Sequence, residues 1–405
     1  MIQDVIHKSI VSNIDAVNDW FKQKGNQLKF PIYSSYDIRD SGYKVAPVDA
    51  NIYPAGFNNI CQIDYEGAVQ IFKRYMDKKY PGVNHIALLA EEHTKNPYYW
   101  DNISKILGII KGADKKACVG WAKDMTEDFV AENSIGEEIV VHPIKRQGNK
   151  ITMHGHQVDF IVSNNDFSVS YDGYFKGAEV IVDPFYELGW FRRRKHDFFR
   201  HYNTLVEEFC KVIDLDPWLM SVETSLFENF DLNDQETLHR LAHEVDVLLK
   251  KQKEKFIQYD RSEDPFVIIK NNSGTYGLAV LTVNSAEEVL AFNNKARKKM
   301  KATKGGGGVN QVVIQEGIPT RLISEEETAE PALYMIGDEL AGGFLRAHKQ
   351  KGPNESLNSP GAIYKRLCVS DLKINVEGYP LENVYGWLAK LGVLAIGKEI
   401  DQFSL

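Results

Sequence analysis

The chain has 405 residues, of which 43% are hydrophobic and 26% are charged, and its formal net charge is −8. This composition is close to the globular average, so it excludes collagen-like, disordered and disulfide-scaffold proteins, and the length indicates roughly two to four structural units. The acidic balance disfavours a nucleic-acid-binding protein and leaves any anion binding to local clusters of Lys and Arg.

The N-terminal residues and the apolar runs indicate neither secretion nor membrane insertion. Met1–Asn13 includes Asp4 and has no continuous apolar segment, which argues against a secretory signal. The apolar runs, such as Ile86–Ala90, are too short to span a membrane. The cysteines form no CxxC motif, so we expect small buried side chains in a reducing cytoplasm. They are Cys61, Cys118, Cys210 and Cys368.

The first part of the chain alternates strand and helix patterns. Residues 65–80 and 98–110 have the spacing of amphipathic helices. Strands are predicted by the short apolar runs at 85–90, 158–162 and 179–182. Alternation of this kind predicts an open α/β sheet, in an N-terminal domain of residues 1–200.

A helical segment follows, and strand patterns then return. Apolar residues between 241 and 249 recur at spacings of three and four beside a Lys-rich face, which predicts a helical connector at residues 201–260. The remainder, residues 261–405, is predicted to be an α+β domain. Its strands are expected at 266–270, 309–315 and 332–336. The four glycines 305–308 predict a mobile loop.

The strongest local pattern is the strand 266–270 followed by Asn-Asn-Ser-Gly-Thr-Tyr-Gly. Gly274 and Gly277 permit close backbone approach, Ser273 and Thr275 add hydroxyl donors, and Lys270 brings a charge to the strand end. Such a turn can hold phosphate, but it is not a Walker A loop, in which the lysine follows the glycines. Taken alone, a glycine hairpin with an incidental lysine explains the pattern equally well.

Three further segments strengthen this interpretation. The strand 312–316 ends in Gln-Glu before a Gly-Ile-Pro turn, which suits the adenine edge and ribose hydroxyls of a nucleotide. A strand, glycine turn and second strand at 331–346 end on Arg346. In the turn 354–361, Glu355 and Asn358 can supply two oxygen ligands to Mg²⁺.

In this order the segments resemble the ATP-grasp fold across about residues 250–365. The resemblance implies that ATP binds with Mg²⁺ and that a substrate carboxylate is phosphorylated before an amine or thiol attacks it. Residues 273–277 would cover the phosphates, Glu316 would be the hydrogen-bonding carboxylate of an adenine-binding hinge, and Arg346 would stabilise the acyl phosphate. The expected nucleotide-binding residues are Lys270, Ser273, Gly274, Thr275, Gly277, Gln315, Glu316 and Ile318, and the expected catalytic residues are Lys270 and Arg346.

The metal ligands and a second phosphate-binding lysine are less defined. Most ligases of this superfamily carry a late Glu-x-Asn, and none follows Asn358. The candidate metal ligands are Glu330, Glu355 and Asn358, with solvated surface carboxylates as the alternative. A second lysine is expected upstream of the glycine loop, where Lys250, Lys251, Lys253 and Lys255 are equal candidates and a solvated helix face is the default.

The N-terminal domain contains a stretch, residues 36–59, that is dense in polar side chains between proline and glycine turns. Such a stretch is costly to bury unless a ligand or an internal network satisfies it. Arg39 and Lys44 can hold carboxylates. An α-amino group can be held by Asp49, Asn51 and Asn58.

Together with residues 95–102 and 358–361, this stretch resembles the minor bacterial family of glutamate–cysteine ligases over nearly the whole chain. The family implies ATP-dependent joining of the glutamate γ-carboxylate to the cysteine amine, the first step of glutathione synthesis. Glutamate would then be bound by Arg39, Asp49, Asn51 and Asn58. The resemblance implies that the partners are the small molecules glutamate, cysteine and ATP, and that the protein binds neither nucleic acid nor membranes. The sequence does not determine the oligomeric state, and a homo-oligomer is one possibility.

Two alternatives remain at this point. One is another ATP-grasp carboxylate–amine ligase with different amino acids, and the other is a nucleotide- or amino-acid-binding regulator without turnover. The joint presence of Lys270, Glu316, Arg346 and Asn358 favours an enzyme, since a regulator can lose the arginine and still bind ATP.

Two further clusters have simpler explanations. The basic run at 191–195 can bind a carboxylate or phosphate, although a salt-bridge network or solvated helix start is the favoured interpretation. His154 and His156 have the spacing of a metal chelate, but without a third ligand nearby a strand-and-turn pair is favoured.

Overall fold

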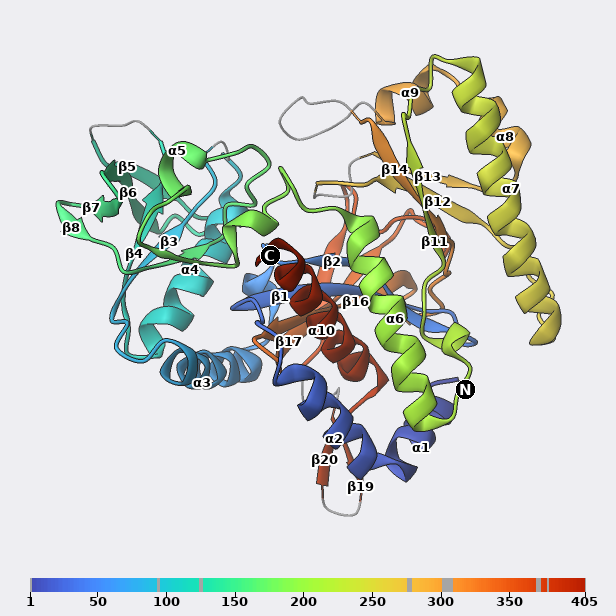
Figure 1. The fold of residues 1–405 in the computed structure, drawn as a ribbon, viewed down its shortest axis with the longest axis horizontal. Coiled ribbons are helices and arrows are strands. Elements are labelled where there is room, and N and C mark those ends of the chain that lie inside the picture. Colours follow the sequence, from blue (N-terminus) through green and yellow to red (C-terminus); the bar gives the residue numbers. More distant parts are fainter. Residues whose placement is uncertain are drawn as a thin grey trace.

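The computed structural model describes residues 2–92, 95–123, 127–274, 279–300, 309–368, 373–376 and 379–404. Three larger sheets follow one another across the molecule (Figure 1). The eight-stranded sheet lies at the left of that view, the central six-stranded sheet in the middle and the four-stranded sheet at the right. The mixed α/β and α+β fold class expected from the sequence is confirmed. The four glycines expected to form a loop lie outside the described residues.

The central sheet joins strands from both ends of the chain. Its order is β18-β17-β16-β1-β2, with β15 paired to β16, and every pair is antiparallel. The strands are β1 (Tyr33–Asp40), β2 (Val45–Asn51), β15 (Ile323–Ser324), β16 (Glu327–Ile336), β17 (Glu339–His348) and β18 (Ile363–Arg366). The polar stretch 36–59 therefore begins with a hairpin whose first strand pairs with β16.

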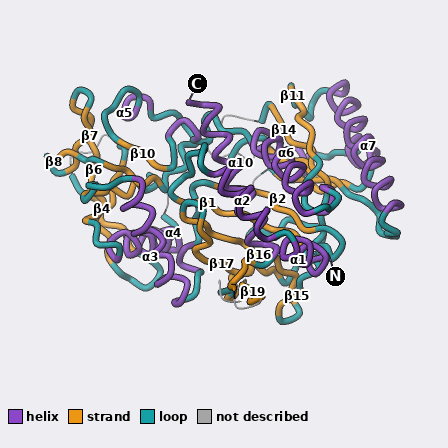
Figure 2. The backbone as a smooth tube through the Cα atoms, turned by 60° about the horizontal axis from the view of Figure 1, so that its bottom comes forward, coloured by secondary structure: helices purple, strands orange, loops and turns teal. Residues whose placement is uncertain are grey.

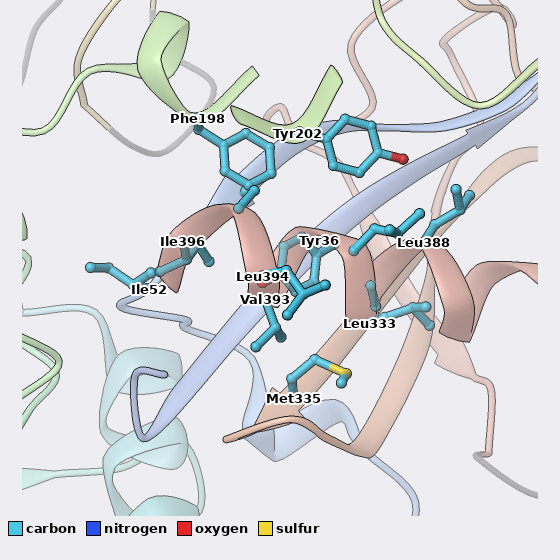
Figure 3. Packing of buried hydrophobic residues seen from close by; sticks show 14 of the residues in the cluster. Tyr36, Ile52, Phe198, Tyr202, Leu333, Met335, Leu388, Val393, Leu394 and Ile396 are labelled. Atoms are coloured by element: carbon cyan, nitrogen blue, oxygen red, sulfur yellow. The ribbon is translucent and has the colours of Figure 1, made fainter. Parts of the chain in front are cut away.

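Two helices, α6 (Lys195–Ile213) and α10 (Val384–Ser404), pack together beside the central sheet. Most of α10 is apolar and buried, as expected of a helix in a core rather than at a surface. Figure 3 shows Tyr36, Leu333 and Met335 of the sheet packed against Leu388, Val393, Leu394 and Ile396 of α10, with Phe198 and Tyr202 of α6 nearby. A Cβ atom at Gly392 would overlap the Tyr36 ring, so glycine allows this close approach.

The eight-stranded sheet contains the α/β pattern expected in the first 200 residues. Its order is β10-β9-β3-β4-β6-β7-β8, with β5 paired to β6, and the pairs from β10 to β6 are parallel. The strands are β3 (His85–Leu89), β4 (Lys116–Trp121), β5 (Phe129–Glu132), β6 (Glu138–Gln147), β7 (Lys150–Met153), β8 (His156–Gln157), β9 (Phe160–Ser163) and β10 (Ile181–Asp183). Helices α3 (Gln62–Lys79) and α4 (Pro97–Gly112) pack against each other beside it, close to the predicted ranges.

A buried carboxyl group, Asp183, ties this sheet to its surroundings. It accepts hydrogen bonds from the Ile32 amide at 2.7 Å, the Tyr75 hydroxyl at 2.9 Å and the Tyr80 hydroxyl at 3.1 Å. Burial raises the pKa of Asp183 from its ordinary 3.8 to about 6, against the lowering effect of these donors. Ionisation of Asp183 is therefore less favourable in the folded protein than in the unfolded chain.

This raised pKa predicts a pH dependence of stability. The folded state holds the Asp183 proton between about pH 4 and pH 6, where the unfolded chain releases it, so the free energy of unfolding falls as the pH rises through this window. The fall amounts to about 3 kcal/mol. Urea unfolding of the wild type and Asp183→Asn at several pH values should show this slope only in the wild type. Parallel curves would contradict the assignment.

The four-stranded sheet is antiparallel, in the order β11-β14-β12-β13. Its strands are β11 (Thr224–Glu228), β12 (Val267–Asn271), β13 (Val280–Val283) and β14 (Gln311–Glu316). Helix α7 (Gln235–Gln258) covers it (Figures 1 and 2), with α8 (Ala286–Leu290) and α9 (Asn294–Met300) near its upper end in Figure 1. The segment expected to be a purely helical connector thus also contains β11, which pairs with β14.

The remaining elements are short or peripheral. They are α1 (Ile2–Ser12), α2 (Ile14–Gly25), α5 (Asp172–Phe175), the 3₁₀ turns η1 (Phe57–Asn59), η2 (Tyr186–Leu188) and η3 (Pro217–Leu219), and the hairpin β19 (Lys373–Val376) and β20 (Tyr379–Glu382). The domain limits at 200 and 260 stay predictions, although the central sheet joins segments from both sides of them. Within the described residues, no helix has the length and apolarity needed to cross a membrane.

Three of the four cysteines differ from the expectation of isolated buried thiols. Cys61 and Cys368 form a disulfide, with their Cα atoms 5.9 Å apart. Cys210 is a buried free thiol, as expected, whereas Cys118 is exposed. The sequence did not indicate the disulfide because 307 positions separate its partners, and only the fold brings η1 and β18 together.

Candidate active site

Two cavities lie next to each other around β1 and β2. One is a narrow cleft of about 90 Å³ between these strands and the four-stranded sheet. The other is a wide cavity of about 1110 Å³ on the side of the eight-stranded sheet. Asp37, Asp49 and Asn358 line both of them, so the two cavities meet at these three residues.

The narrow cleft gathers most of the residues singled out from the sequence. β1, β2, β12, β14 and β16 contribute its walls, together with the start of α6 and the turn 354–358. The predicted site residues that line it are Arg39, Asp49, Lys270, Ser273, Gly274, Gln315, Glu316, Ile318, Glu330, Glu355 and Asn358. Thr275 and Gly277 lie outside the described residues.

Lys270 lies near the end of β12, as the sequence pattern indicated, and is 6% exposed. Its ammonium group donates to the Val48 carbonyl at 2.6 Å and to Oε1 of Gln315 at 3.0 Å. Burial lowers the pKa of Lys270 to about 7, although Asp49 acts in the opposite direction. Among the described residues this ammonium group has no direct carboxylate partner, so it can receive an anion.

Gln315 and Glu316 end β14, which pairs with β12, and Gln315 accepts a hydrogen bond from Lys270. Nε2 of Gln315 is buried and has no hydrogen-bond partner among the described residues, so this amide can still donate to a ligand. Glu316 instead has internal partners: its Oε1 accepts from the Lys44 ammonium and from the Glu223 amide. Lys44, which the sequence suggested for a substrate carboxylate, is thus paired with Glu316.

A second cleft lysine, Lys195, ends the basic run 191–195, for which the sequence favoured a salt-bridge network or solvated helix start over a carboxylate or phosphate site. It begins α6, lines the narrow cleft and donates to Asp49. The lysines at 250–255 on α7 instead form ion pairs with nearby carboxylates at the surface. This arrangement agrees with the solvated helix face expected for them by default. In the basic run 191–195, Arg193 makes a buried bidentate pair with Glu399, and only Lys195 faces the cleft.

The pairing of β1, β16 and β17 assembles a charged cluster where the cavities meet. Glu330 and Arg346 are direct partners across β16 and β17. Arg346 grips Asp37 in bidentate fashion, at 2.7 and 3.1 Å, and donates to Glu330 at 2.8 Å. Burial and the nearby Glu330 raise the pKa of Asp37, against the lowering effect of Arg346. Asp37 was not predicted as a site residue.

Arg39 has internal partners instead of open space. Its Nε atom pairs with Glu330, and its two terminal nitrogens donate to the carbonyls of Pro353 and Glu355, each at 2.7 Å. The Glu355 side chain accepts from Lys351 and from the Gly352 amide, which lowers its pKa. These bonds correspond to an internal brace between β1 and the turn 353–358.

Most residues that line the wide cavity carry a polar side-chain group, among them the predicted Asn51 and Asn58. Three further lining residues each have a buried donor atom with no partner among the described residues. These donors are the Tyr53 hydroxyl, Nε1 of Trp190 and Nε of Arg346. Because buried donors are normally paired, a cluster of unpaired ones indicates a site that a polar ligand completes. Sequence patterns did not indicate Tyr53 or Trp190, since each resembles an ordinary core aromatic.

Comparison with known proteins agrees with this arrangement. A model of the family "GshA: Glutamate-cysteine ligase" matches residues 7–400. A crystal structure from Methylobacillus flagellatus KT, of a protein assigned as a gamma-glutamylcysteine synthetase, is 30% identical over 99% of this chain and 96% of that chain, with a TM-score of 0.85. None of the curated proteins matches the sequence.

Two other solved structures are much less similar. A glutathione synthetase like-effector from Globodera pallida is 10% identical over 90% of this chain and 85% of that chain, with a TM-score of 0.41. The D-alanyl-alanine synthetase A from Vibrio cholerae is 11% identical over 78% and 81%, with a TM-score of 0.34. These scores are too low to indicate a shared fold. From the match over residues 7–400 and the Methylobacillus structure, the chain belongs to the GshA glutamate-cysteine ligase family and is an ATP-dependent ligase of glutathione-type synthesis.

Proposed function

We propose that this protein joins the γ-carboxylate of glutamate to the amine of cysteine, with ATP converted to ADP and phosphate through an acyl phosphate. The observation that carries the proposal is the meeting of the two cavities at Asp37, Asp49 and Asn358. A nucleotide in one cavity and an amino acid in the other would bring the γ-phosphate and a carboxylate to the same place, which is the main requirement of phosphoryl transfer.

The narrow cleft is our candidate for the nucleotide. Lys270 and Lys195 would contact the phosphates, and the unpaired Gln315 amide would donate to the adenine edge, in the ATP-grasp-like arrangement expected from the sequence.

The charge of the cleft supports a role for Mg²⁺. Carboxylates from Asp37, Asp49, Glu330 and Glu355 line the same space as the two lysines, and a triphosphate would be repelled by them unless cations intervene. Carboxylate and amide oxygens are the ligands that Mg²⁺ takes in proteins, so Asp37 joins the sequence candidates Glu330, Glu355 and Asn358 as a possible ligand. When bound, Mg²⁺ would neutralise charge on the transferring phosphoryl group.

The wide cavity is our candidate for glutamate and cysteine. The donors of Tyr53, Trp190 and Arg346 suit a carboxylate, and Asn51 and Asn58 suit an ammonium group. In this proposal Arg346 holds the reacting carboxylate, because the guanidinium nitrogens of Arg39 already have internal partners.

The proposed chemistry has two steps. A γ-carboxylate oxygen attacks the γ-phosphorus, and the bond to the bridging oxygen of ADP breaks. The cysteine amine then attacks the acyl carbon, phosphate leaves with the former carboxylate oxygen, and the amine loses a proton. Lys270 and Arg346 would stabilise the charge that develops in each step, and the surrounding walls would keep water from the acyl phosphate.

A single assay tests the proposal. Release of ADP and phosphate should require Mg²⁺, glutamate and cysteine together. In a screen with glutamate held constant and a panel of amino acids tried as the second substrate, cysteine should support this release. With ATP labelled at the βγ-bridging oxygen, glutamate alone should scramble the label, because a reversible acyl phosphate forms before the amine binds. Formation of AMP, or equal turnover with an unrelated amino acid, would overturn the proposal.

A further inference from the structure

A cluster of two histidines and an aspartate lies in the eight-stranded sheet, apart from both cavities. Nδ1 of His142 lies 2.6 Å from Nε2 of His154 and 3.0 Å from Oδ1 of Asp128. Oδ2 of Asp128 is 4.0 Å from the same His154 nitrogen. One ligand atom from each residue lies within 4.8 Å of the other two. Neither cavity is lined by any of these residues.

The fold, rather than sequence spacing, creates this cluster. β6 pairs Ile144 with Met153 of β7, so His142, two residues earlier on the same face, lies beside the turn that follows β7. His154 and Gly155 form this turn, both with positive φ, and Met153 pairs with His156 across it. Asp128 directly precedes β5, whose first residue Phe129 pairs with Val141, the neighbour of His142.

Hydrogen bonding alone satisfies this arrangement poorly. A neutral imidazole carries one N–H, so the Nδ1 atom of His142 can make at most one good hydrogen bond, either to the carboxylate or to the second imidazole. A cation in place of the proton would accept lone pairs from all three groups at once. Two imidazoles and a carboxylate are a donor set that zinc and similar transition-metal ions prefer, whereas Mg²⁺ favours oxygen ligands.

We propose that Asp128, His142 and His154 bind one divalent transition-metal ion, for which Zn²⁺ is the probe. Two nitrogen ligands of a tetrahedral zinc lie about 3.3 Å apart, since each Zn–N bond is about 2.0 Å, so the two nitrogens would separate by less than about 1 Å and the His154 ring would turn its Nε2 atom toward the ion. His154 is half exposed and can make this movement. The three ligands leave a fourth position to water, and the site is independent of the proposed ligase function.

His156 provides a matched control. From the sequence it is the natural chelate partner of His154, but it lies on β8 outside this cluster. The proposal therefore predicts that metal binding requires His142 and does not require His156, which lies fourteen residues later. Both variants remove one imidazole from the same hairpin region, so they differ mainly in whether a ligand is lost.

The test is Zn²⁺ binding to the full chain by calorimetry, with excess Mg²⁺ and without reductant so that the Cys61–Cys368 pair stays oxidised. Wild type and His156→Ala should bind one equivalent with equal affinity. His142→Ala and Asp128→Asn should each lower the Zn²⁺ affinity at least about tenfold. Loss of a residue that only supports a metal ligand already costs that much. Co²⁺ should give a visible spectrum in the wild type that His142→Ala removes.

Three results would overturn the proposal. They are no stoichiometric binding to the wild type, equal binding by His142→Ala, and loss of binding in His156→Ala alone. Thermal unfolding of each variant without metal separates ligand loss from misfolding, and Asp128→Asn keeps the test valid if His142→Ala does not fold. Without metal, the variants should melt at the same temperature as the wild type. Zn²⁺ should raise the melting temperature only of proteins that keep all three ligands.

Discussion

Replacement of Lys270 by methionine is expected to reduce ATP-dependent turnover by a factor of about 10²–10³, the loss typical when one charged donor to a transition state is removed. Methionine fills a similar volume but leaves the Val48 carbonyl and Gln315 Oε1 without their donor, so a stability loss of about 1–3 kcal/mol accompanies it. Steady-state phosphate release and thermal unfolding measure the two effects. Near-normal turnover in the folded variant would reject Lys270 as a phosphate ligand.

The low pKa of Lys270 gives this prediction a pH signature. In the free protein the ammonium group loses its proton around pH 7, and a bound triphosphate would favour the charged form. ATP binding should therefore weaken as the pH rises above about 7, approaching about tenfold per pH unit. Lys270→Arg is the control, because its guanidinium stays charged and its ATP affinity should not follow this pH profile. Identical profiles for wild type and Lys270→Arg would contradict the assignment.

Local sequence patterns predicted the strands β12 and β14 of the narrow cleft well. Lys270, Gln315 and Glu316 lie at the ends of β12 and β14, where apolar runs give way to polar residues. A strand that ends in such residues can be recognised without knowledge of its neighbours. The partner of each side chain could not be recognised, and Glu316 is an example, since its lysine partner lies 272 positions away.

Long-range strand pairing explains what the sequence did not reveal. Alternation places Asp37 and Arg39 on one face of β1, but only the pairing of β1 with β16 brings Glu330 and Arg346 to that face. For the same reason the sequence predicts only a helical connector where the short strand β11 lies, because the pairing of β11 with β14 is what stabilises this strand. The sequence also could not indicate the donors of Tyr53 and Trp190. They are recognised only because the described residues place no hydrogen-bond partner beside them.

Arg346 and Arg39 form a matched pair for the last prediction, because both contact Glu330 from neighbouring strands. Arg346 lines the wide cavity, and its Nε has no partner in the part of the chain that the structure describes, whereas Arg39 is bound to Glu330 and to two carbonyls of the turn 353–355. Lysine at either position keeps the charge but loses the guanidinium fork. Each substitution should therefore weaken the cluster and reduce the free energy of unfolding by about 1–3 kcal/mol.

The kinetic effects should separate the two arginines. Arg346→Lys is expected to lower kcat/KM for glutamate by about 30-fold to several thousand-fold, since a charged hydrogen-bonded contact in a buried site is worth about 2–5 kcal/mol. Arg39→Lys should change kcat/KM for glutamate and for ATP little, because its bonds brace β1 against a turn. Measuring both constants beside the melting temperature distinguishes binding from bracing. Arg39→Lys could instead lower kcat/KM for glutamate as strongly as Arg346→Lys. In that case the substrate carboxylate would lie between the two arginines, and Glu330 would have to break its ion pair with one of them when glutamate binds.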